Sequence, residues 1–123
     1  MSKLACGIDL IEIERMSAAI QRHGDRLLDR IFTLVELAEM REDHASLAAR
    51  YAAKEAVAKA LGTGIGPVGW KEIEILRSPA GQPVLRLNGV AAQLATDLGL
   101  INWAISISHT RSHAIALAVA CGD

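Results

Sequence analysis

RYAAKEAVAKALGTGIG, residues 50–66, is the stretch that decides how this chain is expected to fold. It continues an alanine-rich run from residue 44, and larger side chains recur along that run at the spacing of one helix face: Leu47, Tyr51, Ala58 and Leu61. The pattern predicts a helix over 44–61. Gly62 is suited to end this helix, because glycine readily adopts the left-handed conformation that closes many helices. The glycine-rich residues 62–66 then predict a flexible loop.

Shorter elements are expected on both sides of the long helix. Upstream, the pattern predicts a strand over 3–13, helices over 15–23 and 25–31, and a helix that begins at Thr33. Glu36 follows Thr33 at capping-box spacing. Downstream, it predicts strands over 71–77 and 83–87, a helix over 89–98, and strands over 103–109 and 114–120. This order, with an antiparallel hairpin at its end, predicts an α+β fold of mixed helices and a largely antiparallel sheet.

The composition limits the classes of function. With 123 residues, 51% of them hydrophobic, the chain is expected to form one domain over 1–123 with a substantial core. Its few aromatic residues argue against a platform that stacks nucleic-acid bases, and its net charge of −1 predicts no general attraction to polyanions. No apolar run reaches membrane-spanning length, and the N-terminus makes a poor signal peptide. We therefore expect a cytoplasmic protein with no nucleic-acid or membrane partner.

The two cysteines, Cys6 and Cys121, each lie within an apolar run near opposite ends of the chain. Their spacing fits neither a zinc site nor a disulfide framework. Because free cysteine is among the most buried residue types, we expect both to be buried thiols, as suits a reducing compartment.

Asp9 is the first residue that could carry chemistry. By period two it shares a strand face with Ile11 and Ile13, so the pattern places a carboxylate beside the core. An unpaired carboxylate is costly to bury, and it therefore needs a metal, a cation or a hydrogen-bond donor. The residues alone leave two interpretations open, a metal ligand or a structural hydrogen-bond anchor.

Glu55 and Lys59 lie one turn apart on the long helix. The ordinary interpretation is a surface ion pair at i,i+4. Alternatively, the small Ala48 and Ala52 on the same face leave room for a ligand to approach Glu55. The loop that follows does not match the known phosphate loops, which precede a helix rather than end one.

Two further features are open to more than one interpretation. His109, at the end of a strand, could join Asp9 and Glu55 in a metal site or hold a phosphate, although spacing alone does not bring the three together. Residues 15–30 carry four arginines against two aspartates, which indicates either a solvated helix face or a docking surface for an acidic partner.

Four motifs, in order along nearly the whole chain, resemble those of the holo-acyl-carrier-protein synthases, the single-lobed 4′-phosphopantetheinyl transferase family. GIDLIE, residues 7–12, resembles the family's G-x-D-x-x-E motif, and Phe32-Thr33 with Glu36 resembles F-T-x-x-E. Residues 50–66 resemble its helix-and-loop signature almost throughout, and ISISHT, residues 105–110, resembles S-x-S-H-T. The long helix-and-loop match is the most specific of the four.

The resemblance implies a role for each matching residue. It makes Asp9 and Glu55 ligands of Mg²⁺, and it places Lys59 beside the pyrophosphate of coenzyme A, so these three form the expected catalytic set. Further residues that it places along the coenzyme A site are Arg50, Gly64, His109 and Thr110. Arg15, and less directly Arg22 and Arg26, would meet the acidic recognition helix of acyl carrier protein. The resemblance also implies a homotrimer with its sites between subunits.

The implied reaction transfers phosphopantetheine from coenzyme A to a serine of apo acyl carrier protein and releases 3′,5′-ADP, in support of fatty acid biosynthesis. Because the nucleophile belongs to the carrier protein, this chain needs no nucleophile motif. Rival interpretations are a coenzyme A-binding module without transferase activity, a Mg²⁺-dependent phosphohydrolase, and a purely structural trimer.

Overall fold

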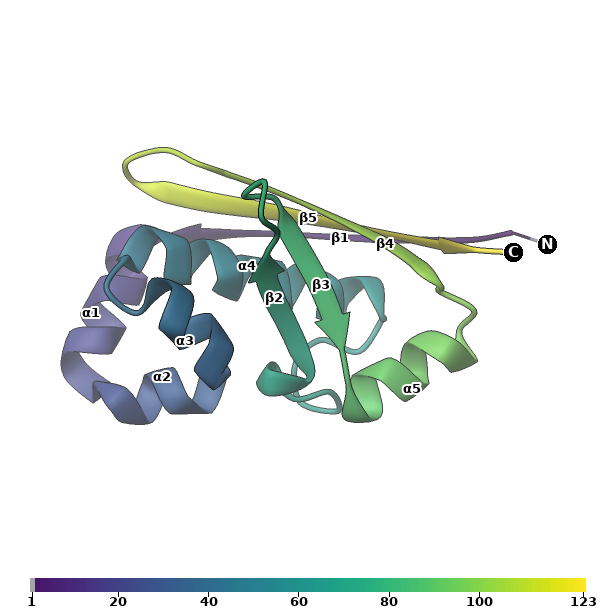
Figure 1. Ribbon diagram of the computed structural model, residues 1–123, viewed down its shortest axis with the longest axis horizontal. Coiled ribbons are helices and arrows are strands. Elements are labelled where there is room, and N and C mark those ends of the chain that lie inside the picture. Colours follow the sequence, from purple (N-terminus) through teal and green to yellow (C-terminus); the bar gives the residue numbers. More distant parts are fainter. Residues whose placement is uncertain (1) are drawn as a thin grey trace.

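A three-stranded antiparallel sheet covered on one face by a long helix organises the computed structural model, which describes residues 2–123 (Figure 1). The sheet contains β1 (Lys3–Glu12), β5 (His113–Gly122) and β4 (Asn102–His109), with β5 in the middle. The long helix, α4 (His44–Ala60), lies beneath it. Asp43 caps the start of α4 by accepting a hydrogen bond from the Ser46 amide at 3.1 Å.

Small side chains let α4 lie close against the sheet. The α4 face toward the sheet is rich in buried alanines, and the facing side chains of β5 are alanines too: Ala114, Ala116, Ala118 and Ala120. On β1 the contact narrows further at Gly7, where an added Cβ would overlap the backbone carbonyl of Ala56. The chain therefore brings a strand and a helix together at backbone distance, and Asp9 follows two residues later on the same strand face.

The remaining elements extend the core at both ends of α4. Before it come three short helices, α1 (Ile13–His23), α2 (Asp25–Ile31) and α3 (Leu34–Met40). After it come a 3₁₀ turn, η1 (Trp70–Glu72), the hairpin β2 (Ile73–Arg77) and β3 (Pro83–Leu87), and α5 (Gly89–Asp97). The β2–β3 hairpin forms a second, separate antiparallel sheet that crosses beneath the first (Figure 1).

The α+β class and the antiparallel pairing predicted from the sequence are confirmed. The Thr33–Glu36 capping box is present, since the Glu36 amide donates to Thr33 Oγ1 at 3.2 Å and the Thr33 amide donates to Glu36 Oε1 at 2.9 Å. Gly62 ends the long helix with φ of 87°. Some boundaries differ: β1 stops at Glu12 and Ile13 already begins α1, while the strand predicted over 71–77 begins only at Ile73, after a 3₁₀ turn.

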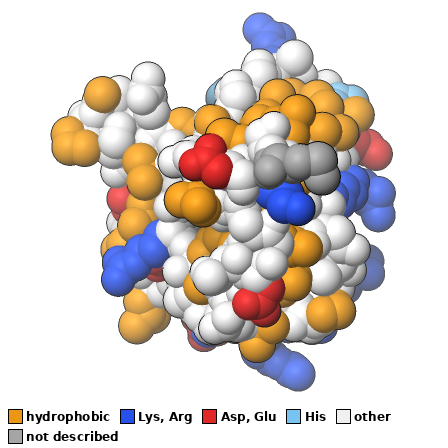
Figure 2. All heavy atoms as spheres, turned by 90° about the vertical axis from the view of Figure 1, so that its right-hand side faces the viewer, with side chains coloured by type: hydrophobic (Ala, Val, Ile, Leu, Met, Phe, Trp, Pro, Cys, Tyr) orange, Lys and Arg blue, Asp and Glu red, His pale blue; other side chains and the backbone are white. Residues whose placement is uncertain are grey.

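The prediction that both cysteines are buried is wrong, because Cys6 and Cys121 are exposed free thiols. Both lie on the face of the three-stranded sheet that α4 does not cover. That face is apolar as well, with Leu4 80%, Ile8 54%, Leu10 60% and Leu117 39% exposed. Hydrophobic side chains gather in the upper part of Figure 2, at the level of the sheet in Figure 1. Alternation cannot identify the buried face of a strand whose two faces are both apolar.

In residues 2–123, no helix has the length and apolar character needed to cross a membrane.

Gly7→Ala should lower the free energy of unfolding by about 1–3 kcal/mol, because the new methyl group overpacks the contact between β1 and α4. Urea unfolding followed by circular dichroism measures the loss. Gly69→Ala is the matched control, since its added Cβ would meet only the Glu72 side chain, at 3.5 Å. Equal losses in the two variants would contradict the close packing at Gly7.

Candidate functional site

A cavity of about 690 Å³ opens between the end of β1, the N-terminal helices and α4. Its polar part is lined by Asp9, Glu12, Arg15, Arg30, Glu55, Lys59 and His113. Its apolar part is lined by Leu10, Ile11, Met16, Ala19, Leu27, Ile31, Tyr51 and Trp70. The cavity therefore places charged groups of both signs beside an apolar wall, as is usual for a small-molecule site.

Asp9, Glu55 and Lys59 converge in this cavity from two elements. Asp9 projects from the inner face of β1, while Glu55 and Lys59 project from the same side of α4, one turn apart. Lys59 Nζ donates to the Ile8 carbonyl at 2.9 Å and to Asp9 Oδ1 at 3.2 Å. Lys59 therefore pairs with Asp9 on the strand, instead of forming the i,i+4 pair with Glu55 that is the ordinary expectation for a helix.

Glu55 lies in an environment that disfavours its charge. Burial, and then the nearby negative charge of Asp9, raise the pKa of Glu55 above its ordinary value, while Lys59 acts in the opposite direction. Burial also raises the pKa of Tyr51, with Glu55 and Asp9 adding to the effect. A further cation beside Asp9 and Glu55 would relieve the repulsion between their negative charges.

The donor set fits Mg²⁺. In residues 2–123, no three or more His, Cys, Asp or Glu side chains are arranged to hold a metal among themselves. Mg²⁺, however, is commonly bound through one or two carboxylates, with phosphate oxygens and waters completing its shell. Asp9 and Glu55 supply that number of carboxylates, and they lie close enough for the charge of Asp9 to raise the pKa of Glu55.

Among the predicted partner-binding arginines, Arg15 lines the cavity, whereas Arg22 and Arg26 lie exposed outside it on α1 and α2. Arg30, which pattern reasoning placed only within a general basic patch, also reaches the cavity. The basic side of the cavity is therefore continuous with the N-terminal helices.

His113, Tyr51 and Trp70 line the cavity although sequence reasoning assigned them no role in a site. His113 is exposed, and its Nδ1 lies 2.8 Å from Ser112 Oγ. It reaches the cavity because β5 pairs it with Glu12 at the end of β1, a register that no local pattern in the sequence indicates.

Four residues expected along the coenzyme A site do not line the cavity of this single chain: Arg50, Gly64, His109 and Thr110. His109 and Thr110 lie at the C-terminal end of β4, and β5 separates β4 from β1. Thr110 contacts the cavity residue His113, whose amide donates to Thr110 Oγ1 at 3.1 Å. His109 also acts on the start of α4. Hydrogen bonds from Ser46 are the main cause that lowers the pKa of Asp43, and the charge of His109 lowers it further. Gly64 lies in the loop beyond the other end of α4, with φ of 67°.

Arg50 is buried, and its guanidinium is engaged inside the chain. It donates to the Ile75 carbonyl and, through Nε, to Met40 Sδ at 2.8 Å, and it lies 3.9 Å from Glu39 Oε1. This placement gives no support to the predicted contact of Arg50 with coenzyme A and indicates a structural part in holding β2.

Glu55→Gln should change the free energy of unfolding in a pH-dependent way. The difference between the variant and the unchanged chain should favour the variant more at about pH 8 than at about pH 4. Because the folded state raises the pKa of Glu55, it binds that proton more tightly than the unfolded state does. The unchanged chain therefore loses stability as pH rises from the ordinary pKa of Glu55 through its raised one, and the glutamine variant escapes that loss.

Urea midpoints over this pH range, in buffer free of divalent cations, test the expectation. Glu42→Gln, on the exposed turn before α4, controls for the general effect of removing one negative charge. A stability difference that stays constant over the whole pH range would show that Glu55 does not titrate as described.

Known proteins resemble this chain in both sequence and fold. Residues 5–118 match the 4′-phosphopantetheinyl transferase superfamily. The holo-[acyl-carrier-protein] synthases of Herpetosiphon aurantiacus and Moorella thermoacetica are 45% and 49% identical to it, over 97% and 94% of this chain and 99% and 92% of theirs. The solved holo-[acyl-carrier-protein] synthase of Helicobacter pylori, in complex with coenzyme A, is 30% identical with a TM-score of 0.86, over 94% of this chain and 98% of that one. This chain therefore belongs to the 4′-phosphopantetheinyl transferase superfamily, among its holo-[acyl-carrier-protein] synthases.

Proposed function

We propose that this chain transfers the 4′-phosphopantetheine group of coenzyme A to a serine of apo acyl carrier protein and releases 3′,5′-ADP. The observation that carries the proposal is the convergence of Asp9, Glu55 and Lys59 in one cavity, within a chain of this family. The serine oxygen forms a bond to the phosphorus next to pantetheine, and the bond from that phosphorus to the oxygen leading to ADP breaks. The serine proton is released.

Asp9 and Glu55 hold Mg²⁺ in this proposal. When bound, the ion neutralises charge on the pyrophosphate oxygens, which is the chief requirement of phosphoryl transfer. Lys59, whose side chain is half exposed, already pairs with the Asp9 carboxylate and can turn its ammonium group toward the departing phosphate. The apolar wall beside these groups limits water at the reacting phosphorus.

Arg15 and its neighbouring arginines bind the carrier protein. Arg15 lines the cavity, while Arg22 and Arg26 extend the basic surface outward along α1 and α2. An acidic helix on the carrier would meet this surface and bring its serine toward Glu55. Such charge complementarity mainly raises the rate and specificity of association.

The working form is a homotrimer. The uncovered face of the sheet carries an apolar patch formed by Leu4, Ile8, Leu10 and Leu117, and contiguous patches of this kind commonly mark interfaces. A neighbouring copy would bring its own His109, Thr110 and Gly64 to the coenzyme A that occupies the cavity. This arrangement accounts for the fact that these three residues do not line the cavity of their own chain. A cytoplasmic location remains our prediction.

An intact-mass assay tests the transfer. Apo acyl carrier protein incubated with this protein, coenzyme A and Mg²⁺ should gain one phosphopantetheine group, and chelation of the metal should prevent the gain. Asp9→Asn should reduce the rate by roughly a hundredfold or more while the fold is retained, because one metal ligand is lost.

The same assay separates the rival functions. A phosphohydrolase would consume coenzyme A without carrier protein, and a binding module would leave both substrates unchanged. When carrier concentration is varied, Arg15→Ala should raise the KM for carrier and leave the KM for coenzyme A unchanged; the reverse pattern would reject the assignment of Arg15.

Sedimentation velocity tests the trimer. Leu117→Asp, in the middle of the uncovered face, should convert the trimer to monomers, because it would bury an unpaired charge in the interface. Leu34→Asp is the matched control, since Leu34 is 82% exposed on α3, away from that face. A wild-type monomer, or a trimer that survives Leu117→Asp, would refute the proposed assembly.

A further inference from the structure

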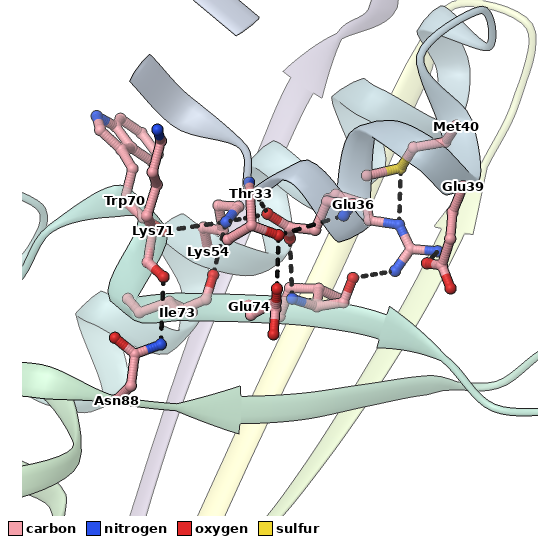
Figure 3. Close-up of polar contacts among 12 residues, drawn as sticks. Thr33, Glu36, Glu39, Met40, Lys54, Trp70, Lys71, Ile73, Glu74 and Asn88 are labelled. Atoms are coloured by element: carbon pink, nitrogen blue, oxygen red, sulfur yellow. Dashed lines mark hydrogen bonds and ion pairs between the residues drawn. The ribbon is translucent and has the colours of Figure 1, made fainter. Parts of the chain in front are cut away.

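The inner edge of β2 is held by charged side chains instead of by a neighbouring strand. β2 pairs with β3 along one edge only. On the other edge, Lys54 Nζ donates to the Ile73 carbonyl at 2.6 Å, the Ile75 amide donates to Glu36 Oε2 at 2.9 Å, and Arg50 donates to the Ile75 carbonyl. Three side chains from α3 and α4 thus satisfy backbone groups that would otherwise be buried without partners (Figure 3).

Lys54 and Glu36 form the centre of this arrangement. Both side chains are 0% exposed, and Lys54 Nζ lies 2.8 Å from Glu36 Oε1. Lys54 also donates to the Trp70 carbonyl at 2.9 Å, so its ammonium group has three oxygen partners. A buried pair with this many directed bonds fixes the geometry of the segments that it joins.

One of those bonds reaches the catalytic cavity. The Trp70 backbone held by Lys54 carries an indole ring whose centroid lies 4.9 Å from that of Tyr51, with the planes tilted by 30°. Tyr51 and Trp70 both line the cavity, and Tyr51 precedes Glu55 by one turn of α4. Lys54 itself does not line the cavity.

We propose that the buried Lys54–Glu36 pair is a positioning device that sets the Trp70–Tyr51 wall against Glu55, and through that wall the placement of the acceptor serine. This inference rests on the proposed transfer reaction and adds positioning residues to it. Lys54 acts through the Trp70 carbonyl and Glu36 acts through Lys54. An apolar side chain of similar volume could fill the space of Lys54, but it could not hold the carbonyls of Trp70 and Ile73.

The test separates positioning from stability by removing the two charges together. Lys54→Met alone leaves the Glu36 carboxylate buried without its cation and should unfold at a lower urea concentration. Adding Glu36→Gln removes that unpaired charge and should restore much of the lost stability. The double variant still lacks the bond to the Trp70 carbonyl. All variants carry Trp103→Phe, so that Trp70 is the one remaining tryptophan and its emission reports on the wall.

In the double variant we expect acrylamide to quench the fluorescence of Trp70 more strongly, because its ring becomes more accessible. We also expect kcat for transfer to fall at least tenfold, while the KM for coenzyme A changes less than twofold. Leu100→Ala, a core truncation at the far end of the molecule, controls for lost stability and should leave Trp70 emission unchanged. Trp70→Ala should reproduce the kinetic loss, even if a Lys54 variant fails to fold.

Three results would overturn the inference: unchanged Trp70 emission in the double variant, an unchanged kcat in that variant, or a wild-type kcat in Trp70→Ala. Failure of the proposed function is recognised separately, since the Trp103→Phe parent would then transfer no phosphopantetheine. In that case the emission measurement alone still decides whether Lys54 places Trp70.

Discussion

The structure depends on the close approach of α4 to the inner face of the three-stranded sheet. Gly7 and the facing alanines allow backbone to meet backbone there, and larger side chains would hold the two elements apart. The approach also has a chemical result. It brings Asp9, from a strand near the N-terminus, to Lys59, fifty positions later in the chain. The small side chains that allow this close packing thus also bring the charged groups of the cavity together.

Charged side chains hold the inner edge of β2, where proteins more often place a neighbouring strand. Lys54, Arg50 and Glu36 complete the hydrogen bonding of β2 and connect it to α3 and α4. Buried ion pairs add little net stability when compared with well-packed apolar residues. Here they fix the geometry of the backbone, because each of their hydrogen bonds determines where a particular carbonyl or amide lies. The Trp70 carbonyl is one of these, and its ring forms part of the cavity.

Local patterns predicted the elements well, because the signals are local. The alanine-rich helix, its end at Gly62 and the Thr33–Glu36 capping box each follow from residues within a few positions of one another. Asp9 lies on the inner face of β1, as expected, but alternation alone did not distinguish that face from the outer one, which is apolar too. Interactions between distant segments could not be predicted in this way. Lys59 pairs across to Asp9 instead of along its helix, and the cysteines lie on an apolar face that one chain leaves uncovered. Family resemblance supplied the proposed roles that spacing could not, and Arg50 is occupied inside the fold.

The sealed inner edge of β2 also bears on the motions of the molecule. The Ile75 amide is fully buried, and its acceptor is a carboxylate that has no exposure to water. That amide can exchange its hydrogen with solvent only when α3, α4 and β2 separate, which also breaks the Lys54 and Arg50 bonds. Opening at this point is therefore tied to global unfolding. We therefore expect the helical end and the hairpin to open as one cooperative unit, while local openings of low free energy occur in exposed turns such as that between β2 and β3.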